Sequence, residues 1–231
     1  NRELPIMKEL HHPNIVELKS YYCTKAEKCD DGSEFYLNCI MEYVPLTLSD
    51  LIDKNRKNRT KFDTILLKIY SYQMLKCIGY LHSLGIAHRD IKPQNILIAN
   101  GKYKLCDFGD IRVMKRDGIV VQRIRGSELY MSPILFYGLR RGVQTIEHNT
   151  YKSDVFSLGM CLFYAACLSY DGPVEIREVI DMNMKYQILN KYLGARYSQK
   201  LIKILHLMLQ TEESARPDFI LLEEAIMKYG L

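Results

Sequence analysis

The sequence predicts an α+β fold in which a small strand-containing part is followed by a larger, mostly helical part. Residues 15–22 and 35–43 are rich in β-branched and aromatic side chains, which is typical of strands. Between residues 61 and 83, apolar residues recur at intervals of three and four, so they share one face of a long helix. Three or four more helices are expected from Tyr151 onward, and Pro45 marks the joint between the two parts.

Local signals indicate the shorter elements of the small part. Residues 1–10 have helical spacing, and Pro5 fits there only within the first turn. The pair His12-Pro13 ends that helix, because a residue before proline avoids the helical conformation. The charged segment 24–34 contains Asp31-Gly32 and is expected to be a loop between two strands.

The larger part is expected to begin with a short helix at 46–55. Residues 96–99 and 103–106 flank Asn100-Gly101, a dipeptide that tolerates the positive φ angles of a tight hairpin. Residues 107–150 lack sustained periodicity and are expected to be loop-rich.

The last third of the chain is predicted to be helical. The nearly apolar stretch Val155–Leu168 is too short to span a bilayer, so it is interpreted as a buried core helix, and no membrane partner is expected. Apolar spacing at 201–208 and 219–229 predicts two of the helices that follow.

Composition indicates an ordinary globular protein. Of 231 residues, 48% are hydrophobic, and the net charge of +5 is spread along the chain, so no nucleic-acid partner is expected. The seven cysteines form no CxxC pair, which favours reduced, mostly buried thiols in a cytoplasmic protein, the nucleus not being excluded. The chain begins with Asn1 and helical sequence follows at once, so we expect it to be part of something longer.

The motif His88-Arg89-Asp90-Ile91-Lys92-Pro93-Gln94-Asn95 carries the sharpest chemical signal, and Asp107-Phe108-Gly109 follows it after the predicted hairpin. Together they supply two carboxylates, an amide oxygen and a lysine at the ends of short strands. Magnesium prefers oxygen ligands and usually takes one or two carboxylates together with phosphate oxygens. Another carboxylate must accept a proton from the attacking hydroxyl, and a lysine can neutralise phosphoryl charge.

This set of motifs resembles the eukaryotic protein kinase family, and the resemblance covers essentially the whole chain. It implies that Asp90 is the catalytic base, that Asn95 and Asp107 bind Mg²⁺, and that Lys92 contacts the γ-phosphate of ATP. A lysine at position 92 resembles the serine/threonine kinases rather than the tyrosine kinases.

The resemblance also implies a nucleotide site that draws on both parts of the chain. In it Met41 is the gatekeeper residue, the backbones of Glu42 and Val44 bond the adenine, and Leu97 and Cys106 form the apolar floor. The full set of expected nucleotide-site residues is Glu3, Met41, Glu42, Val44, Thr47, Gln94, Leu97 and Cys106.

Further resemblances extend to the substrate side and to the core. Residues 126–133 resemble the loop that docks the peptide substrate, with Ser127 where these kinases keep a threonine near the catalytic base. Asp154 matches the residue that holds the catalytic-loop backbone from a buried helix. The stack of side chains that supports an active kinase is expected at Met7, Leu18, His88 and Phe108.

Three arginines, Arg2, Arg89 and Arg112, are expected to form an anion site. In many kinases such a cluster binds a phosphate on the activation loop. Here residues 110–125 contain no Ser, Thr or Tyr, so no local phosphate can fill it. Either Asp117, solvent and counterions screen the arginines, or they bind a phosphate already present on the substrate, as in the glycogen synthase kinase type. Segments 1–4, 43–45 and 82–95 resemble that type most.

Two departures from the family pattern stand out. The glycine-rich loop and the strand lysine that would pair with Glu3 are absent, so residues 1–44 match a partial small lobe and 45–231 the large lobe. We therefore expect the 231 residues alone to be an impaired enzyme. Ile134 replaces a glutamate that normally pairs with the arginine found here as Arg216, which must find another acceptor or face water.

The expected function is transfer of the γ-phosphate of ATP-Mg²⁺ to a serine or threonine of a protein substrate. The alternative is a pseudokinase or scaffold that binds partners and keeps the fold without efficient turnover. A small-molecule phosphotransferase is a third option, which the peptide-docking loop at 126–133 disfavours.

Overall fold

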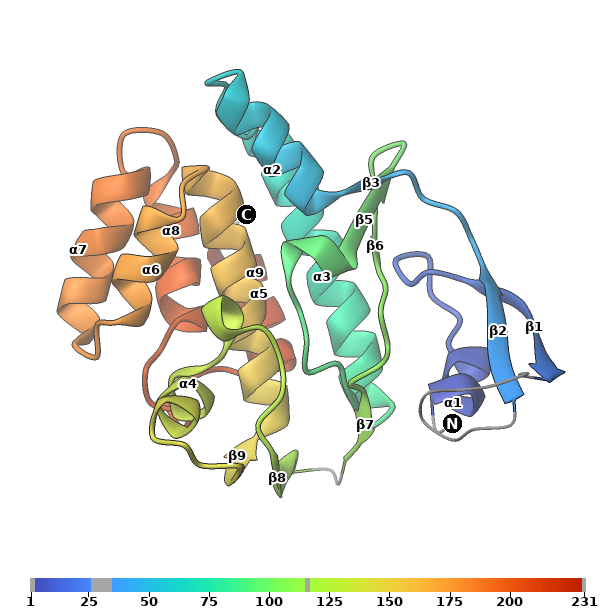
Figure 1. Ribbon diagram of the computed structural model, residues 1–231. Helices are drawn as coiled ribbons and strands as arrows, with labels where there is room; N and C mark the ends of the chain where they lie inside the picture. Colours follow the sequence, from blue (N-terminus) through green and yellow to red (C-terminus); the bar gives the residue numbers. More distant parts are fainter. Residues whose placement is uncertain (1–2, 26–34, 115–116, 230–231) are drawn as a thin grey trace.

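The computed structural model describes residues 3–25, 35–114 and 117–229 of the chain. Within them a small part holds one helix and a strand pair, and a larger part is mostly helical, as the sequence predicts (Figure 1). The helices are α1 (Glu3–Glu9), α2 (Leu48–Lys57), α3 (Thr64–Ser83), α4 (Pro133–Arg140), α5 (Thr150–Cys167), α6 (Asp171–Arg177), α7 (Met182–Leu193), α8 (Gln199–Met208) and α9 (Phe219–Tyr229). The strands are β1 (Leu18–Lys25), β2 (Phe35–Met41), β3 (Leu46–Thr47), β4 (Ile86–Ala87), β5 (Ile96–Ala99), β6 (Lys102–Leu105), β7 (Arg112–Val113), β8 (Ile119–Arg123) and β9 (Thr145–Asn149).

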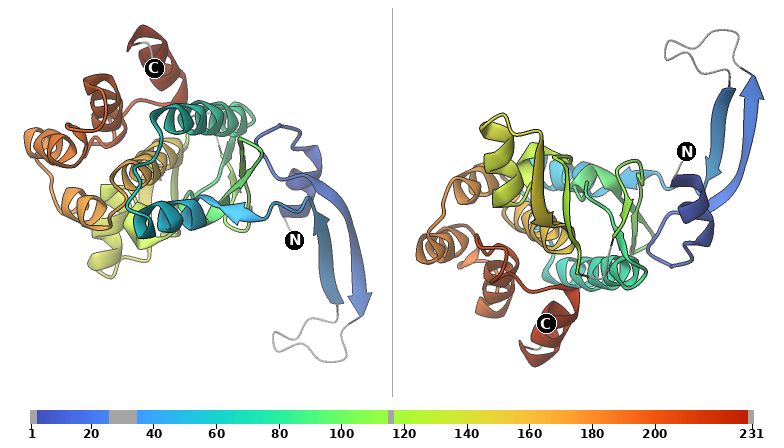
Figure 2. Two further views of the ribbon diagram at one scale, coloured as in Figure 1. Left: turned by 90° about the horizontal axis from the view of Figure 1, so that it is seen from above. Right: turned by 90° about the horizontal axis from the view of Figure 1, so that it is seen from below.

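Strands β1 and β2 pair antiparallel and project away from the helical part of the molecule (Figure 2). Most residues of both strands are exposed. The first strand begins at Leu18 rather than at Ile15 and continues through Thr24, which we expected in a loop. Ile15 instead forms an isolated parallel bridge with Leu105. Cys39 lies exposed on β2, so the expectation of a buried thiol is wrong there.

Asn14 fixes the small part to the larger one. Its Nδ2 donates to Gln73 Oε1 and to the Tyr103 carbonyl, each at 2.8 Å. Its own carbonyl accepts from the backbone N–H of Leu105 at 2.8 Å and from Cys77 Sγ at 3.1 Å. These four bonds tie the segment after α1 to α3 and to β6. They therefore fix the position of the small part relative to the helical part.

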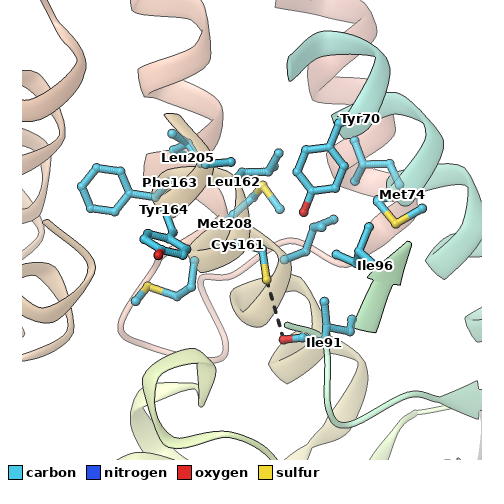
Figure 3. Packing of buried hydrophobic residues seen from close by; sticks show 14 of the residues in the cluster. Tyr70, Met74, Ile91, Ile96, Cys161, Leu162, Phe163, Tyr164, Leu205 and Met208 are labelled. Atoms are coloured by element: carbon cyan, nitrogen blue, oxygen red, sulfur yellow. Dashed lines mark hydrogen bonds between the residues drawn. The ribbon is translucent and has the colours of Figure 1, made fainter. Parts of the chain in front are cut away.

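Helix α5 lies at the centre of the larger part, and its residues from Thr150 to Cys167 are almost all buried. It contacts α3, α6 and α8. Its side chains pack with those of α3 and α8 in one apolar core (Figure 3). Cys161 Sγ donates to the Ile91 carbonyl at 3.7 Å, which joins this core to the loop after β4. The prediction of a buried core helix is confirmed, and no helix of the described residues is long and apolar enough to cross a membrane.

The loop-rich stretch predicted between residues 107 and 150 also contains elements that the sequence did not predict. This stretch contains α4 and the strands β8 and β9, which pair antiparallel over five residue pairs. The sequence does not predict the β8–β9 pair, because polar rather than apolar side chains are buried in it. Gln122 is 3% exposed, while the neighbouring Val121 is 61% exposed. Five helices, α5–α9, follow residue 149 in the described chain rather than three or four, and α8 and α9 match the predicted segments.

Two buried cations hold the C-terminal end of α8. Arg216 is 1% exposed, and it donates to the carbonyls of Gln210 (2.8 Å) and Lys152 (3.0 Å). Lys185, also 1% exposed, donates from Nζ to the Leu209 carbonyl at 2.9 Å. Carbonyls at a helix C-terminus carry partial negative charge, which favours cations there. Burial lowers the pKa of Arg216 to about 10 and that of Lys185 to about 8.

The expectation that Arg216 finds another acceptor is therefore confirmed. Backbone carbonyls take the place of the glutamate that Ile134 replaces, and the guanidinium also lies 5.0 Å from the centre of the Phe156 ring. Ile134 itself packs against the apolar cluster of Met131, Leu135 and Phe136.

We predict that Arg216→Ala lowers the free energy of unfolding by about 3 kcal/mol or more, because it leaves buried carbonyls without donors. Urea denaturation followed by circular dichroism measures this change. Arg196→Ala is the control, since Arg196 is exposed, and it should shift the free energy by less than about 0.5 kcal/mol. Equal stability of the two variants would contradict the prediction.

Candidate active site

Three of the predicted residues contact the side chain of Asp90, two of them from the loop between β4 and β5. Lys92 Nζ lies 2.5 Å from Asp90 Oδ2, and Asn95 Nδ2 lies 3.1 Å from the same oxygen. Ser127, from the predicted docking loop, donates from Oγ to Asp90 Oδ1 at 3.0 Å. The Asp90 side chain is 11% exposed and that of Lys92 23%, so both are shielded while remaining accessible.

Asp107 lies at the end of β6, next to this loop. The backbone N–H of Cys106 donates to the Asn95 carbonyl at 3.0 Å, which brings the Asn95 and Asp107 segments side by side. Asp107 and Arg89 both adopt left-handed backbone conformations, with φ of 61° and 73°. Such conformations are costly for residues other than glycine and cluster at functional sites. Phe108 packs edge-on against His88, with ring centres 5.4 Å apart, as the predicted stack requires.

The donor set at Asn95 and Asp107 fits a hard cation. Asn95 uses its Nδ2 on Asp90, so within the described chain its Oδ1 makes no hydrogen bond. Asp107 is exposed, its carboxylate accepts only a 3.4 Å bond from the Gly109 N–H, and no described cation pairs with it. An amide oxygen and a carboxylate oxygen are ligands that Mg²⁺ prefers.

Asp154, on α5, holds the start of the loop between β4 and β5 in place. Its Oδ2 accepts from the backbone N–H of His88 and its Oδ1 from that of Arg89, both at 2.9 Å. His82 Nε2 lies 3.0 Å from Oδ2. Burial alone would raise the pKa of Asp154, but the hydrogen bond and charge of His82, with help from His88, hold it below its usual value. The carboxylate therefore remains ionised and keeps three donors in place.

The residues expected to bind adenine line the connection from β2 to α2. Glu42 donates its backbone N–H to the Glu17 carbonyl at 2.9 Å, and its carboxylate pairs with Lys104 at 2.7 Å. Among the described residues, the Glu42 carbonyl and the N–H of Val44 have no backbone partner, so both are available to a ligand. Met41, at the end of β2, is 46% exposed.

The remaining residues expected at the nucleotide site differ in how far they are buried. Leu97 and Cys106 are half-buried, and burial raises the pKa of the Cys106 thiol to about 11, so it stays neutral. Gln94 is exposed. The Thr47 hydroxyl caps α2 by accepting from the Asp50 N–H at 3.0 Å, and the Thr47 N–H donates to Asp50 Oδ2 at 2.8 Å, so this residue is engaged at the start of the helix.

Of the three predicted anion-site arginines, the structure describes two. Arg2 lies outside the described residues, and nothing is described of the Glu3 side chain. Burial lowers the pKa of Arg89, and the nearby charges of Arg112 and Arg125 lower it further, although Asp110 opposes them. The charges near Arg89 are those of Arg112 and Arg125, and the side chain of neither makes a hydrogen bond or salt bridge within the described chain.

Gly126, the first residue of the predicted docking loop, packs closely against the loop between β4 and β5. Its φ is 108°, and a Cβ at this position would lie 2.8 Å from the Arg89 carbonyl. Only glycine adopts this conformation and approaches the catalytic loop so closely. This contact places the next residue, Ser127, against Asp90.

Comparison with known proteins agrees with this geometry. The sequence pattern of the protein kinase domain matches residues 1–227. The chain belongs to the protein kinase family. Glycogen synthase kinase 1 of Pyricularia oryzae is 40% identical over 199 residues, which cover 81% of this chain and 48% of that protein. Protein kinase gsk3 of Schizosaccharomyces pombe is 33% identical over 213 residues, covering 86% of this chain and 52% of that protein. The chain thus spans about half the length of these relatives.

Sequence reasoning missed two parts of this kinase site. The contact of His82 with Asp154 joins residues 72 positions apart, and a lone histidine at a helix end gives no signal of such a partner. Arg125 is not among the residues that the sequence predicts for the anion site. Its alternation with Ile124, which packs into the cluster around Phe136, could have shown that Arg125 points the other way.

We predict that Asp154→Asn lowers the free energy of unfolding by about 1–3 kcal/mol, because an amide turns one acceptor oxygen into a donor facing other donors. Urea denaturation at neutral pH measures it. The lowered pKa means that the wild-type carboxylate stabilises the kinase above the usual aspartate pKa. This advantage is lost as pH falls through the folded-state pKa, so the two proteins should converge in acid.

Asp181→Asn makes the same chemical change at the N-terminus of α7, where asparagine caps as well as aspartate. It should leave stability nearly unchanged. An Asp154→Asn protein as stable as this control at neutral pH would contradict the role given to Asp154.

Proposed function

We propose that the protein transfers the γ-phosphate of ATP to a serine or threonine hydroxyl of a protein substrate. The observation that carries the proposal is the Asp90 carboxylate, which lies between Lys92 Nζ at 2.5 Å and Ser127 Oγ at 3.0 Å. The relatives named as glycogen synthase kinase 1 and protein kinase gsk3 support the same reaction class.

In this proposal each residue has a separate task. Asp90 orients the substrate hydroxyl and accepts its proton, and Asn95 holds Asp90 through two hydrogen bonds from Nδ2. Lys92 offsets negative charge on the transferred phosphoryl group. Asn95 and Asp107 would hold Mg²⁺, which supplies positive charge against the phosphate oxygens of ATP. Ser127 positions the peptide, since its hydroxyl already contacts the base.

We predict that Asp90→Asn, in the full-length protein, lowers kcat on a peptide substrate by about 10²–10⁴-fold and leaves ATP affinity nearly unchanged. Asp90 acts on the hydroxyl and not on the nucleotide. Asp107→Asn should weaken Mg²⁺-dependent nucleotide binding as well as turnover. Steady-state kinetics and titration with a fluorescent ATP analogue, each with and without Mg²⁺, separate these effects.

Asp53→Asn is the matched control, because Asp53 lies on α2 in an exposed pair with Arg56. Wild-type kcat in Asp90→Asn would rule out the assigned base. Nucleotide binding without measurable phosphotransfer by the wild-type protein would favour the pseudokinase alternative.

We also propose that Arg112 and Arg125, the two arginines whose charges act on Arg89, receive a phosphate carried by the substrate. Like charges placed close together without partners favour an incoming anion. The absence of Ser, Thr and Tyr from 110–125 leaves no local phosphate to occupy the cluster. Screening by Asp117 and counterions is the alternative, and the Asp117 carboxylate accepts a bond from the Ile119 N–H at 3.1 Å.

We predict that Arg112→Ala lowers kcat/KM by roughly tenfold for a peptide with a phosphoserine C-terminal to the acceptor, because one charge-assisted contact is lost. The same peptide without phosphate should show no change. Arg141→Ala is the control, since Arg141 is exposed at the end of α4. Equal wild-type rates on the two peptides would rule out a substrate phosphate and leave the screened cluster.

A further inference from the structure

The activation segment, defined as residues 107–134 between Asp107 and Ile134, is paired by a strand from further along the chain. In it β8 pairs with β9 from Ile119↔Asn149 to Arg123↔Thr145. Two backbone bonds extend the ladder, from the Ile124 N–H to the Gln144 carbonyl (3.0 Å) and from the Thr150 N–H to the Gly118 carbonyl (2.9 Å). Since β9 runs directly into α5, the segment is attached to the central helix of the core (Figure 1).

A buried polar network crosses this strand pair. Gln122 on β8 and His148 on β9 are 3% and 4% exposed. Gln122 Nε2 lies 3.0 Å from His148 Nε2 and donates to Thr150 Oγ1 at 2.9 Å. His148 Nδ1 lies 3.5 Å from Ser153 Oγ, which lies 3.0 Å from Ser132 Oγ at the start of α4. The network thus runs from the activation segment through α5 and back to the end of the docking loop.

The protonation state of His148 suits this arrangement. Burial, with the charges of Arg89 and Arg216 and against that of Asp154, lowers its pKa to about 4. The ring is therefore neutral near pH 7. When Gln122 donates to Nε2, the ring proton lies on Nδ1 and faces Ser153. Burial of polar nitrogens is costly unless they are hydrogen-bonded, so Gln122 Nε2 and His148 Nε2 fix each other's place, while Gln122 Oε1 has no hydrogen-bond partner in the described chain.

Arg89, between β4 and β5, binds the activation segment at two places, one near its start and one at the end of β8. Its Nη1 donates to the Asp110 carbonyl at 3.2 Å, and its Nη2 donates to the Arg123 carbonyl at 3.0 Å. In kinases regulated by phosphorylation, such arginines order the loop by binding its phosphate. Here two main-chain carbonyls take that place, and Arg123 directly follows the buried Gln122.

The docking loop, residues 126–133, begins shortly after β8, and the residues that connect the two are closely packed. Ile124 packs into the cluster around Phe136, and a Cβ on Gly138 would lie 2.9 Å from Ile124 Cδ1. Gly126 touches the Arg89 carbonyl as described above, and Ser127 then bonds to Asp90. Only three residues, 124–126, lie between β8 and Ser127, so we expect a shift of β8 to reach Ser127.

We propose that the β8–β9 pair, with Gln122 and His148 as positioning residues, holds the docking loop in its substrate-binding shape without a phosphate on the activation segment. This inference rests on the proposed kinase function. The plain alternative is that the pair contributes only to stability, and the two differ in which kinetic constants change.

The test compares three variants of the full-length protein. His148→Ala should raise the peptide KM by about tenfold while the ATP KM stays within about twofold, because docking and not nucleotide binding depends on the strand pair. His148→Gln, which restores an acceptor near Gln122, should recover most of the peptide affinity. Glu147→Ala, on the exposed face of the same strand, should resemble wild type. An unchanged peptide KM in His148→Ala, or no recovery in His148→Gln, would overturn the proposal.

A second measurement needs no variant. Wild-type protein treated with a protein phosphatase, and shown by intact-mass spectrometry to carry no phosphate, should keep its peptide KM and kcat within about twofold. A loss of activity that matches removal of a phosphate from residues 107–134 would overturn the inference.

Limited trypsin digestion separates failure of this inference from failure of the proposed function. Cleavage after Arg123 and Arg125 should be slow in wild type and at least about tenfold faster in His148→Ala at a temperature where both remain folded. If wild type transfers no phosphate at all, the proposed function fails, and protection that depends on His148 still supports the positioning role. Equal cleavage rates in the two proteins would contradict it.

Discussion

The ionised carboxylate of Asp154 is the contact on which the active site depends. A charged group inside an apolar core is costly unless it is fully hydrogen-bonded, and here three donors meet it: the N–H groups of His88 and Arg89 and the ring of His82. The same bonds hold Arg89 in a left-handed conformation that its own backbone does not favour. The position of Asp90, one residue later, follows from that conformation.

Helix α5 supports the substrate side of the site as well. Ser157 donates to the Tyr130 carbonyl at 2.7 Å, and Ser153 meets Ser132 at 3.0 Å. Asp90, the proposed base, and the predicted docking loop are therefore both anchored to one rigid element, and their separation does not rely on flexible connections. In the proposed reaction, such placement would keep the reacting groups within the narrow tolerance that proton transfer requires.

The sequence was sufficient where chemistry and position are local. Residues 88–95 and 107–109 lie close along the chain, and the Asn100-Gly101 turn fixes how they meet, so their contacts could be predicted. The Gln122–His148 contact could not, because it joins segments 26 residues apart and reverses the usual pattern of apolar side chains inside. The acceptors of Arg216 could not be predicted either, because they are backbone carbonyls, which every residue has.

The two buried cations at the end of α8 bear on how the protein responds to ionic strength. Dissolved salt screens exposed pairs such as Lys191 with Glu175, whose side chains are 60% and 39% accessible. It reaches Arg216 and Lys185 far less, because both are 1% exposed and bind carbonyl dipoles rather than a carboxylate. In concentrated salt the surface pairs weaken first, while the joint between α7, α8 and the core keeps its strength.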